Sequence, residues 1–262
     1  GVYFIDNALL SISEMLNRAT LAAKTCKGNY IETTAIYNPD MSRRLEKEQE
    51  IINEMAPALA KQQFCVYLQP KYSLETSSPV GAEALVRWRH PEKGLIPPGV
   101  FIPVFEKNGF ISRLDYYVWE SICQLLQKWL REGLEPSPVS VNVSRVNLYN
   151  PQIVEIISAL TERYNIPPNL MELELTESTY MDNPAMMESI VEQLHAKGFT
   201  VMMDDFGSGY SSLSVLKDIR VDILKIDTRF FENTRISGRG ENIIASIVRM
   251  AKWLSIPTIA EG

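Results

Sequence analysis

The chain has 262 residues, of which 45% are hydrophobic and 22% are charged, a composition typical of globular proteins. The 32 acidic residues outnumber the 26 Lys and Arg residues, which argues against binding of a nucleic acid polymer, and two His and three separated Cys residues are too few for the usual zinc clusters. Scattered cysteines are also typical of a reducing compartment, so we expect a cytoplasmic location.

Helical patterns dominate the first sixty residues. Residues 13–27 have the spacing of an amphipathic helix that closes at Gly28-Asn29. Residues 41–62 form a charged helical stretch, in which Pro57 predicts a kink or a break. The simplest interpretation of this second stretch is a surface or connecting helix.

From Phe64 onward, short β-rich runs alternate with helices. The predicted strands are 64–70, 79–88, 138–143, 171–175, 199–204, 221–227 and 256–261. The predicted helices begin at an Asp115 cap, at Asn150-Pro151 and at Asn183-Pro184, and a last helix covers 241–254. This alternation predicts an α/β fold with a mostly parallel sheet, and the number of strands in this length favours a barrel.

The predicted strands are not apolar on both faces, as fully buried parallel strands would be. In 79–88, for example, Glu83, Leu85 and Arg87 share one face, and Ala84 and Trp88 lie on the other. Most polar groups fall late in their strands, at the end where barrel active sites are built. They are Glu83, Asn142, Glu174, Asp204, Asp205, Lys225 and Glu261. A single strand Glu is usually a solvated edge residue, but polar groups at one end of six strands indicate a site.

Burying this many carboxylates without partners would be prohibitively costly, so the pattern predicts cations among them. Carboxylate and amide oxygens are ligands of Mg²⁺ or Mn²⁺, and a two-ion centre suits phosphoester hydrolysis. Lys225 could orient the attacking water or neutralise developing charge; the alternative is a salt bridge that only separates the carboxylates. Arg87 is placed to hold a phosphate through its planar guanidinium.

Eight short motifs then occur in a fixed order. They are LQP at 68–70, EALVRW at 83–88, FIPVFEKNG at 101–109, VNVS at 141–144, ELTES at 174–178, DDFGSGYSSL at 204–213, LKID at 224–227 and AEG at 260–262. With these motifs, about residues 64–262 resemble the EAL domain, the cyclic di-GMP-specific phosphodiesterase of bacterial second-messenger signalling.

The resemblance implies a TIM-like (β/α)8 barrel with one antiparallel strand near its start. It also implies hydrolysis of one phosphodiester bond of cyclic di-GMP to linear pGpG, with two Mg²⁺ or Mn²⁺ ions. The implied metal ligands are Glu83, Asn142, Glu174, Asp204, Asp205 and Glu261. Lys225 is implied to act on the catalytic water, and Gln69, Leu85 and Arg87 to contact the substrate.

Glu177 matches the glutamate that holds the loop after the Asp204-Asp205 pair. In the family this loop is linked to metal binding and dimerisation, so the resemblance implies a catalytic role for Glu177, together with Glu83 and Lys225, and a homodimer formed through the EAL domain. The loop contains two glycines, which allow a tight turn after the strand; the alternative is an ordinary strand–helix connection.

Residues 1–38 resemble the C-terminal tail of a GGDEF (diguanylate cyclase-like) domain through AAKTCKGNY, although Thr20 stands where that family usually has Asp. We therefore expect a GGDEF remnant at 1–38, a linking helix at 39–63 and an EAL barrel at 64–262. Since the family barrel continues past AEG, its last strand is expected to be missing and the chain to be part of a longer protein, which could be tethered to a membrane.

Two alternatives remain at this stage. One is a catalytically inactive EAL module that binds cyclic di-GMP as a receptor. The other is an unrelated metal-dependent barrel hydrolase, for which the ordered motifs would be a coincidence. Every implied metal ligand up to Glu261 is present, and this favours the enzyme with cyclic di-GMP as its substrate.

Overall fold

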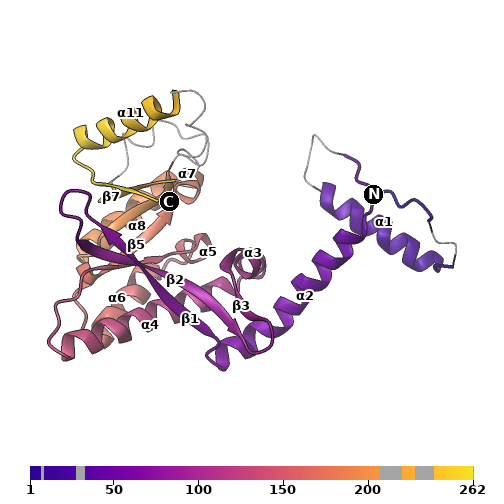
Figure 1. The fold of residues 1–262 in the computed structure, drawn as a ribbon, viewed down its shortest axis with the longest axis horizontal. Helices are drawn as coiled ribbons and strands as arrows, with labels where there is room; N and C mark the ends of the chain where they lie inside the picture. Colours follow the sequence, from indigo (N-terminus) through magenta and orange to yellow (C-terminus); the bar gives the residue numbers. More distant parts are fainter. Residues whose placement is uncertain (7–8, 28–32, 207–219, 228–238, 262) are drawn as a thin grey trace. The chain divides into compact units, whose positions relative to one another are not determined.

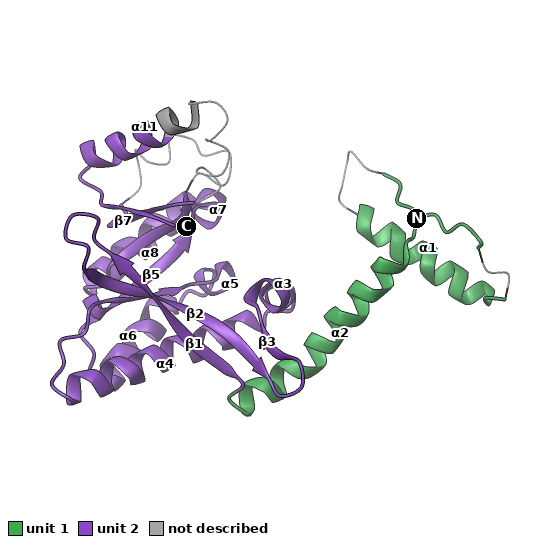
Figure 2. Ribbon diagram, viewed as in Figure 1, with its two compact units in different colours: residues 1–62 green, residues 63–262 purple. Residues whose placement is uncertain are grey.

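The computed structural model describes residues 1–6, 9–27, 33–206, 220–227 and 239–261. The chain divides into two compact units, Gly1–Gln62 and Gln63–Gly262, which are coloured separately in Figure 2. Their boundary lies one residue from the expected start of the EAL barrel. The expected assignment of 1–38 to a GGDEF remnant and of 39–63 to a linking helix stays a prediction.

The smaller unit contains two helices, α1 (Ile12–Cys26) and α2 (Pro39–Ala60). The Ser11 side chain accepts a hydrogen bond from the Glu14 N–H, and the Glu14 carboxylate accepts one from the Ser11 N–H, which forms a capping box before α1. Both predicted helices are confirmed to within two residues. Of the predicted kink or break at Pro57, the break is wrong, because α2 continues through Pro57 to Ala60, and the kink stays a prediction. The predicted closure at Gly28-Asn29 lies outside the described residues.

The larger unit is built on one curled sheet (Figure 1). Its strands are β1 (Phe64–Tyr72), β2 (Pro79–His90), β3 (Gly94–Ile96), β4 (Val139–Asn142), β5 (Met171–Thr176), β6 (Val201–Phe206), β7 (Ile223–Ile226) and β8 (Thr258–Ala260). They pair in the order β1-β2-β4-β5-β6-β7-β8, and β3 pairs with β2. The strands β2 and β4 to β8 run parallel, whereas β1 and β3 are antiparallel to β2.

This arrangement confirms the α/β fold, the seven predicted strands and the antiparallel strand at the start of a TIM-like sheet. In the part of the chain that the structure describes, no pairing joins β8 to β1, so the sheet forms a half-barrel that is open between these two strands. The short strand β3 was not predicted, because three residues are too few for an alternation to be visible.

Helices cover the outer face of the sheet. They are α3 (Pro98–Asn108), α4 (Ile111–Arg131), α5 (Arg145–Leu148), α6 (Ile153–Tyr164), α7 (Glu177–Asp182), α8 (Pro184–Ala196) and α11 (Arg239–Trp253), with a 3₁₀ turn, η1, at Pro168–Leu170. Asn183 caps α8 as predicted, since its side chain accepts a hydrogen bond from the Met186 N–H. No helix among the described residues is both long enough and apolar enough to cross a membrane.

Two helix predictions need correction, and the helix α3 was missed. Asp115 does not cap a helix, because α4 already begins at Ile111 and Asp115 lies inside it. Pro151 lies in a turn, and α6 begins two residues later. The helix α3 was not predicted, because Pro97, Pro98 and Pro103 punctuate its sequence; Pro98 occupies the first turn, where a proline is tolerated.

The main core lies between the outer face of the sheet and α4, α6 and α8, two of which, α4 and α6, pack against each other (Figure 1). Strand residues such as Val141, Leu173 and Met203 are fully buried in it beside Trp119 and Ile157 of the helices. The apolar strand faces therefore meet the helices, as predicted from the alternation. The opposite faces are left for polar side chains inside the curled sheet.

Candidate active site

Four carboxylates surround the ammonium group of Lys225 on the inner side of the sheet. The Lys225 Nζ atom lies 2.5 Å from an oxygen of Glu261, 2.7 Å from Glu174, 3.1 Å from Asp204 and 3.2 Å from Glu83. The Lys225 and Glu174 side chains are only 1% and 0% exposed. The structure thus brings together five of the residues that the sequence predicted to share a site.

Each of these side chains is carried by a different strand or strand end. Glu83 lies in β2, Glu174 in β5, Asp204 in β6 and Lys225 in β7, and Glu261 directly follows β8. The carboxyl ends of parallel strands meet at one edge of a sheet, so residues far apart in sequence converge there. This explains why the polar groups late in the strands form one cluster.

A β-bulge in β6 lies at Asp204, the residue that this strand contributes to the cluster. Met203 pairs with Leu224 and Phe206 pairs with Ile226, so Asp204 and Asp205 together stand opposite one residue of β7. Asp205 has a φ of 56°, a left-handed conformation that Asp adopts more readily than most residues, and its N–H donates a hydrogen bond of 2.8 Å to Asp204. The extra residue lets Asp204 face Lys225 while the side chains before and after the pair both pack outward.

The cluster carries an excess of negative charge. Of the residues that the structure describes, Lys225 is the one cation that forms ion pairs with the four carboxylates, so the formal charge of the cluster is −3 when all four are ionised. Burial alone would lower the pKa of Lys225, but the surrounding carboxylates, Glu174 first among them, raise it well above its ordinary value. The lysine therefore keeps its proton throughout the neutral range.

The carboxylates respond in the opposite sense. Burial raises the pKa of Glu174 to about 7, despite its contact with Lys225. Burial also raises the pKa of Glu261. The pKa values of Glu174 and Glu261 can be raised together with that of Lys225, because four carboxylates share one ammonium group. This single positive charge cannot offset the desolvation of each carboxylate. An additional positive charge at the site would therefore stabilise the ionised carboxylates.

One oxygen in the cluster is also unsatisfied. The Oε1 atom of Glu174 is buried and has no hydrogen-bond partner among the described residues. Across the same part of the chain, no three Asp, Glu, His or Cys side chains are already arranged as a metal cage; the four carboxylates are directed at Lys225. The four carboxylates offer hard oxygen atoms as ligands, and one of these oxygens, on Glu174, has no other partner. Such a set of ligands fits a cation like Mg²⁺ or Mn²⁺.

The other predicted site residues border the cluster. Asn142 ends β4 and pairs in register with Glu174 of β5, and its side chain is exposed. Gln69 of β1 stands directly opposite Glu83 of β2 and is also exposed. Directly opposite residues of an antiparallel pair project from the same face, which places Gln69 beside the carboxylates.

Glu177 is the first residue of α7 and is only 3% exposed. Its predicted role is to hold the loop that follows Asp205. That loop, residues 207–219, lies outside the described residues, so the role of Glu177 and the associated dimer stay predictions.

A cavity of about 630 Å³ is lined by residues that follow Glu83 in β2 and Glu174 in β5 and by the end of β4, although none of the five cluster residues lines it. Leu85, Arg87 and Asn142 line it, together with apolar side chains of α3 and α4 such as Ile102 and Leu114. Its volume falls in the range of small-molecule sites. The predicted substrate contacts Leu85 and Arg87 thus share one pocket with the predicted ligand Asn142.

Three further charged residues, Glu106, Asp115 and Arg145, line this cavity, and none was assigned to the site from the sequence. Arg145, in the first turn of α5, forms an ion pair of 2.5 Å with Asp182 of α7. Asp115 of α4 is 7% exposed, and its Oδ2 atom accepts hydrogen bonds from the Ser144 N–H at 2.8 Å and from the Asn147 side chain at 2.7 Å. The helical spacing of Leu114, Asp115 and Val118 gave a signal, since it puts Asp115 on a buried face.

The Asp115 carboxyl group should make the stability of this unit depend on pH. Burial raises its pKa from 3.8 to about 6, and Glu106 adds a smaller effect in the same direction. A raised pKa means that the folded state binds the proton more tightly than the unfolded state, so stability falls as the pH rises from about 4 to about 6. The shift corresponds to at most about 3 kcal/mol.

We therefore expect Asp115→Asn to be more stable than the wild type at pH 7.5, by up to about 3 kcal/mol, and this advantage to shrink toward zero near pH 4. The amide oxygen can still accept both hydrogen bonds, because both end on one oxygen of Asp115. Urea unfolding of both proteins at several pH values measures the difference. An advantage that does not change with pH would contradict the assignment of a raised pKa.

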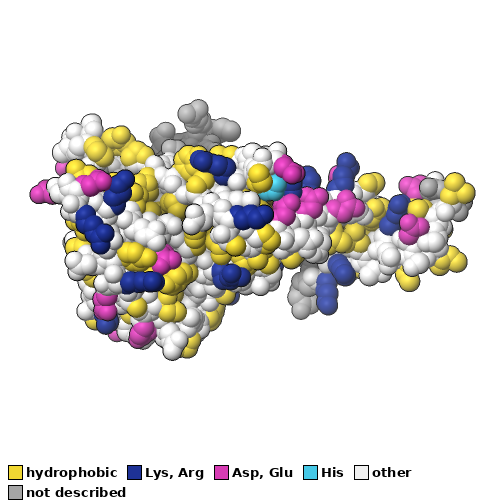
Figure 3. Space-filling model, turned by 90° about the horizontal axis from the view of Figure 1, so that it is seen from below, with side chains coloured by type: hydrophobic (Ala, Val, Ile, Leu, Met, Phe, Trp, Pro, Cys, Tyr) yellow, Lys and Arg dark blue, Asp and Glu magenta, His cyan; other side chains and the backbone are white. Residues whose placement is uncertain are grey.

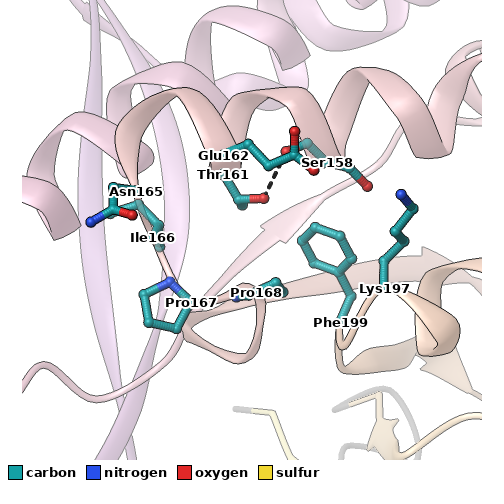
Figure 4. Close-up of a pocket in the computed structure, with 9 residues that line it drawn as sticks. All are labelled: Ser158, Thr161, Glu162, Asn165, Ile166, Pro167, Pro168, Lys197 and Phe199. Atoms are coloured by element: carbon teal, nitrogen blue, oxygen red, sulfur yellow. Dashed lines mark hydrogen bonds between the residues drawn. The ribbon is translucent and has the colours of Figure 1, made fainter.

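A second cavity, of about 370 Å³, lies at the other end of the strands (Figure 4). It is lined by the end of α6 and by the segments that precede β5 and β6, including Asn165, Pro168 and Lys197. The buried Ser158 hydroxyl in its wall has no hydrogen-bond partner among the described residues. None of the predicted site residues lines this cavity, whereas Leu85, Arg87 and Asn142 line the first one, so we do not include it in the candidate site.

Basic side chains on the surface were also considered as a binding site for an anionic ligand. On the face drawn in Figure 3, the described Lys and Arg side chains of the larger unit lie singly rather than in a continuous stripe. That face therefore offers no broad basic surface to an anionic ligand.

Comparison with known proteins agrees with these features. A family model described as "EAL domain" matches residues 52–262. The chain is 31% identical over 249 residues to the bifunctional diguanylate cyclase/cyclic di-GMP phosphodiesterase MucR of Pseudomonas aeruginosa, with 95% of this chain and 36% of MucR covered. It is 32% identical over its whole length to the cyclic di-GMP phosphodiesterase NbdA of the same organism, of which 34% is covered. The chain thus spans about a third of these relatives.

Solved structures give the same result. A structure described as the PaMucR phosphodiesterase in complex with c-di-GMP superposes with a TM-score of 0.77 at 34% identity, covering 81% of this chain and 86% of that one. The EAL domain of FimX from Pseudomonas aeruginosa, bound to c-di-GMP, has a TM-score of 0.72 and covers 80% of this chain and 84% of its own, but at 19% identity it supports the fold alone. Since the family model matches most of its length, this chain belongs to the EAL domain family.

Proposed function

We propose that this protein hydrolyses one phosphodiester bond of cyclic di-GMP and releases linear pGpG. The observation that carries the proposal is the cluster of four carboxylates around the buried Lys225. The relatives MucR and NbdA are named as cyclic di-GMP phosphodiesterases, and this supports the same substrate here. Because the chain spans only part of each relative, the activity of the whole protein is part of the proposal.

The proposed cofactor is Mg²⁺ or Mn²⁺, as two ions. The residues that would hold it are Glu83, Asn142, Glu174, Asp204, Asp205 and Glu261. The net charge of −3 at the cluster and the unsatisfied Glu174 oxygen support this assignment. When bound, such ions lower the pKa of a coordinated water and stabilise the charge that develops on phosphate oxygens.

Lys225 would act as a donor and as a fixed positive charge. Its raised pKa makes it unsuited to accept a proton near neutral pH, which argues against a general base. Its Nζ atom lies 2.5 to 3.2 Å from oxygens of the four carboxylates, among which a donor can orient the attacking water. The alternative from the sequence, a salt bridge that merely separates carboxylates, predicts a loss of stability without a specific loss of turnover.

The substrate would enter the cavity beside the cluster. Its apolar wall, which includes Ile102 and Leu85, suits the flat face of a guanine base. Arg87 can bind a phosphate through two parallel hydrogen bonds, and Gln69 lies next to Glu83 across the β1–β2 ladder. We keep Gln69, Leu85 and Arg87 as the proposed substrate contacts.

Further parts of the proposal concern the assembly. They are a homodimer formed through the EAL domain, a catalytic role for Glu177 through the loop after Asp205, a GGDEF domain fused before residue 39, and a cytoplasmic location of this part of the protein. The burial of Glu177 at the start of α7 is compatible with a positioning role for this residue.

The function is tested by incubating the purified protein with cyclic di-GMP and either Mg²⁺ or Mn²⁺, and by separating the nucleotides by chromatography. We expect pGpG to accumulate, and we expect EDTA to stop its formation and added Mn²⁺ to restore it. Tight binding of cyclic di-GMP without pGpG would instead support the receptor alternative. Turnover that persists after complete removal of divalent ions would contradict the metal assignment.

A further inference from the structure

The helix α4 supports the end of strand β4 from behind. Asp115 accepts hydrogen bonds from the Ser144 N–H at 2.8 Å and from the Asn147 side chain at 2.7 Å. One turn further along α4, the Trp119 indole N–H donates a hydrogen bond of 3.0 Å to the backbone carbonyl of Asn142. Side chains four residues apart in a helix lie on the same face, so α4 holds both ends of the segment 142–147.

Three residues of this network are buried, whereas Asn142 is exposed and Ser144 is partly exposed. The exposed fractions are 7% for Asp115, 1% for Trp119 and 7% for Asn147. Placing a carboxylate here is costly, because among the described residues no ion pair to Asp115 is formed within 4.0 Å. An apolar side chain would avoid that cost but would leave the Ser144 N–H and the Asn147 amide without this acceptor.

The supported segment carries the one amide among the proposed metal ligands. Asn142 is the last residue of β4, and the ladder to β5 pairs it with Glu174, whose carboxylate contacts Lys225. Beyond Asn142 one more ladder bond follows, from the Val143 N–H to the Glu174 carbonyl at 3.0 Å, and α5 begins two residues later at Arg145. The hydrogen bonds from α4 hold the chain where this ladder ends.

We infer that Asp115 is a positioning residue of the active site: through Ser144 and Asn147 it fixes the turn after β4 and thereby the direction of the Asn142 amide. Trp119 contributes to the same function at the other end of the segment. The inference rests on the proposed function in so far as Asn142 is a metal ligand. Outer groups that orient a ligand in this way typically change metal affinity or activity by about 10- to 100-fold when they are removed.

The test compares four variants of the whole protein. Asp115→Leu removes the acceptor, Asp115→Asn keeps a single oxygen that can accept both hydrogen bonds, and Trp119→Phe removes only the indole N–H. The matched control is Cys123→Ala, on the same helix and fully buried, but facing Met171 rather than the turn. Binding of Mn²⁺ without substrate is followed by electron paramagnetic resonance of the free ion, and kcat and KM for cyclic di-GMP are measured separately.

We expect Asp115→Leu to weaken Mn²⁺ binding and to lower kcat by about 10- to 100-fold, with KM changed much less. Asp115→Asn should stay within about twofold of the wild type, because the acceptor is retained, and Trp119→Phe should fall between the two. Cys123→Ala should lower the melting temperature without changing Mn²⁺ affinity. Should Asp115→Leu fail to fold, the ordering of Asp115→Asn, Trp119→Phe and Cys123→Ala still decides the question.

Equal Mn²⁺ affinity in the wild type, Asp115→Leu and Trp119→Phe would overturn the inference, as would a loss in Cys123→Ala as large as theirs. A wild-type protein that binds Mn²⁺ but forms no pGpG would refute the proposed hydrolysis, while the Mn²⁺ affinities would still test the role of Asp115. A wild-type protein that binds no Mn²⁺ would overturn both.

Discussion

Replacing Lys225 with alanine should lower the turnover of cyclic di-GMP by about 100- to 1000-fold, the usual cost of losing one preorganised charge or donor at a reacting centre. The same change leaves four carboxylates facing one another without their cation. Breaking a buried ion pair from one side typically costs about 3–5 kcal/mol of unfolding free energy. We therefore expect a variant that is both slow and, without divalent ions, clearly less stable.

The two effects can be separated by experiment. Steady-state kinetics and equilibrium binding of cyclic di-GMP are measured on folded protein with saturating Mn²⁺, and urea unfolding is measured in EDTA. Lys128→Ala is the control, because the Lys128 side chain is 68% exposed and its contact with Glu132 is long, at 3.9 Å. A variant that binds ligand much more weakly but turns over normally would assign Lys225 to substrate binding instead.

Replacing Glu83 with glutamine should abolish most of the turnover but, unlike Lys225→Ala, should increase the stability of the protein in EDTA. The glutamine has nearly the same size as Glu83 but removes one of the four negative charges around Lys225, so the balance falls from −3 to −2. In EDTA the repulsion within the cluster decreases, and we expect a gain on the order of 1 kcal/mol in unfolding free energy. Turnover should fall by about 100-fold or more, because a proposed metal ligand is lost.

Melting curves in EDTA and in Mn²⁺, together with pGpG formation, measure both quantities. Glu155→Gln, an exposed change on α6, removes the same charge far from the cluster and serves as the control. The proposed role of Glu83 would be refuted by normal turnover. A loss of stability in EDTA would refute the electrostatic argument, since removing a like charge from an uncompensated cluster should not destabilise the fold.

The alternation of apolar and polar residues along the strands was enough to predict much of the fold. In 79–88 it separated Ala84 and Trp88, which the structure buries against helices, from Glu83, which points into the site. The same argument collected Glu174, Asp204, Lys225 and Glu261, because parallel strands bring their carboxyl ends together. Local periodicity was sufficient here, since each strand has one apolar and one polar face.

The alternation could not predict features that depend on strand pairing or hydrogen bonds with residues far away in sequence. The bulge at Asp204-Asp205 reverses the alternation within β6, and only the pairing with β7 reveals it. Asp115 looked like a helix cap because a sequence does not display the Ser144 N–H that it binds in the fold. The strand β3 is defined by its ladder with β2 and has almost no pattern of its own.

The four carboxylates around Lys225 differ in how far solvent reaches them. The Glu261 side chain is 33% exposed, whereas those of Glu83, Asp204 and Glu174 are 16%, 13% and 0% exposed. Charges that keep contact with water are screened more strongly than buried ones. Glu261 is therefore the carboxylate through which dissolved ions first act on the cluster, and Glu174 is the one they reach last.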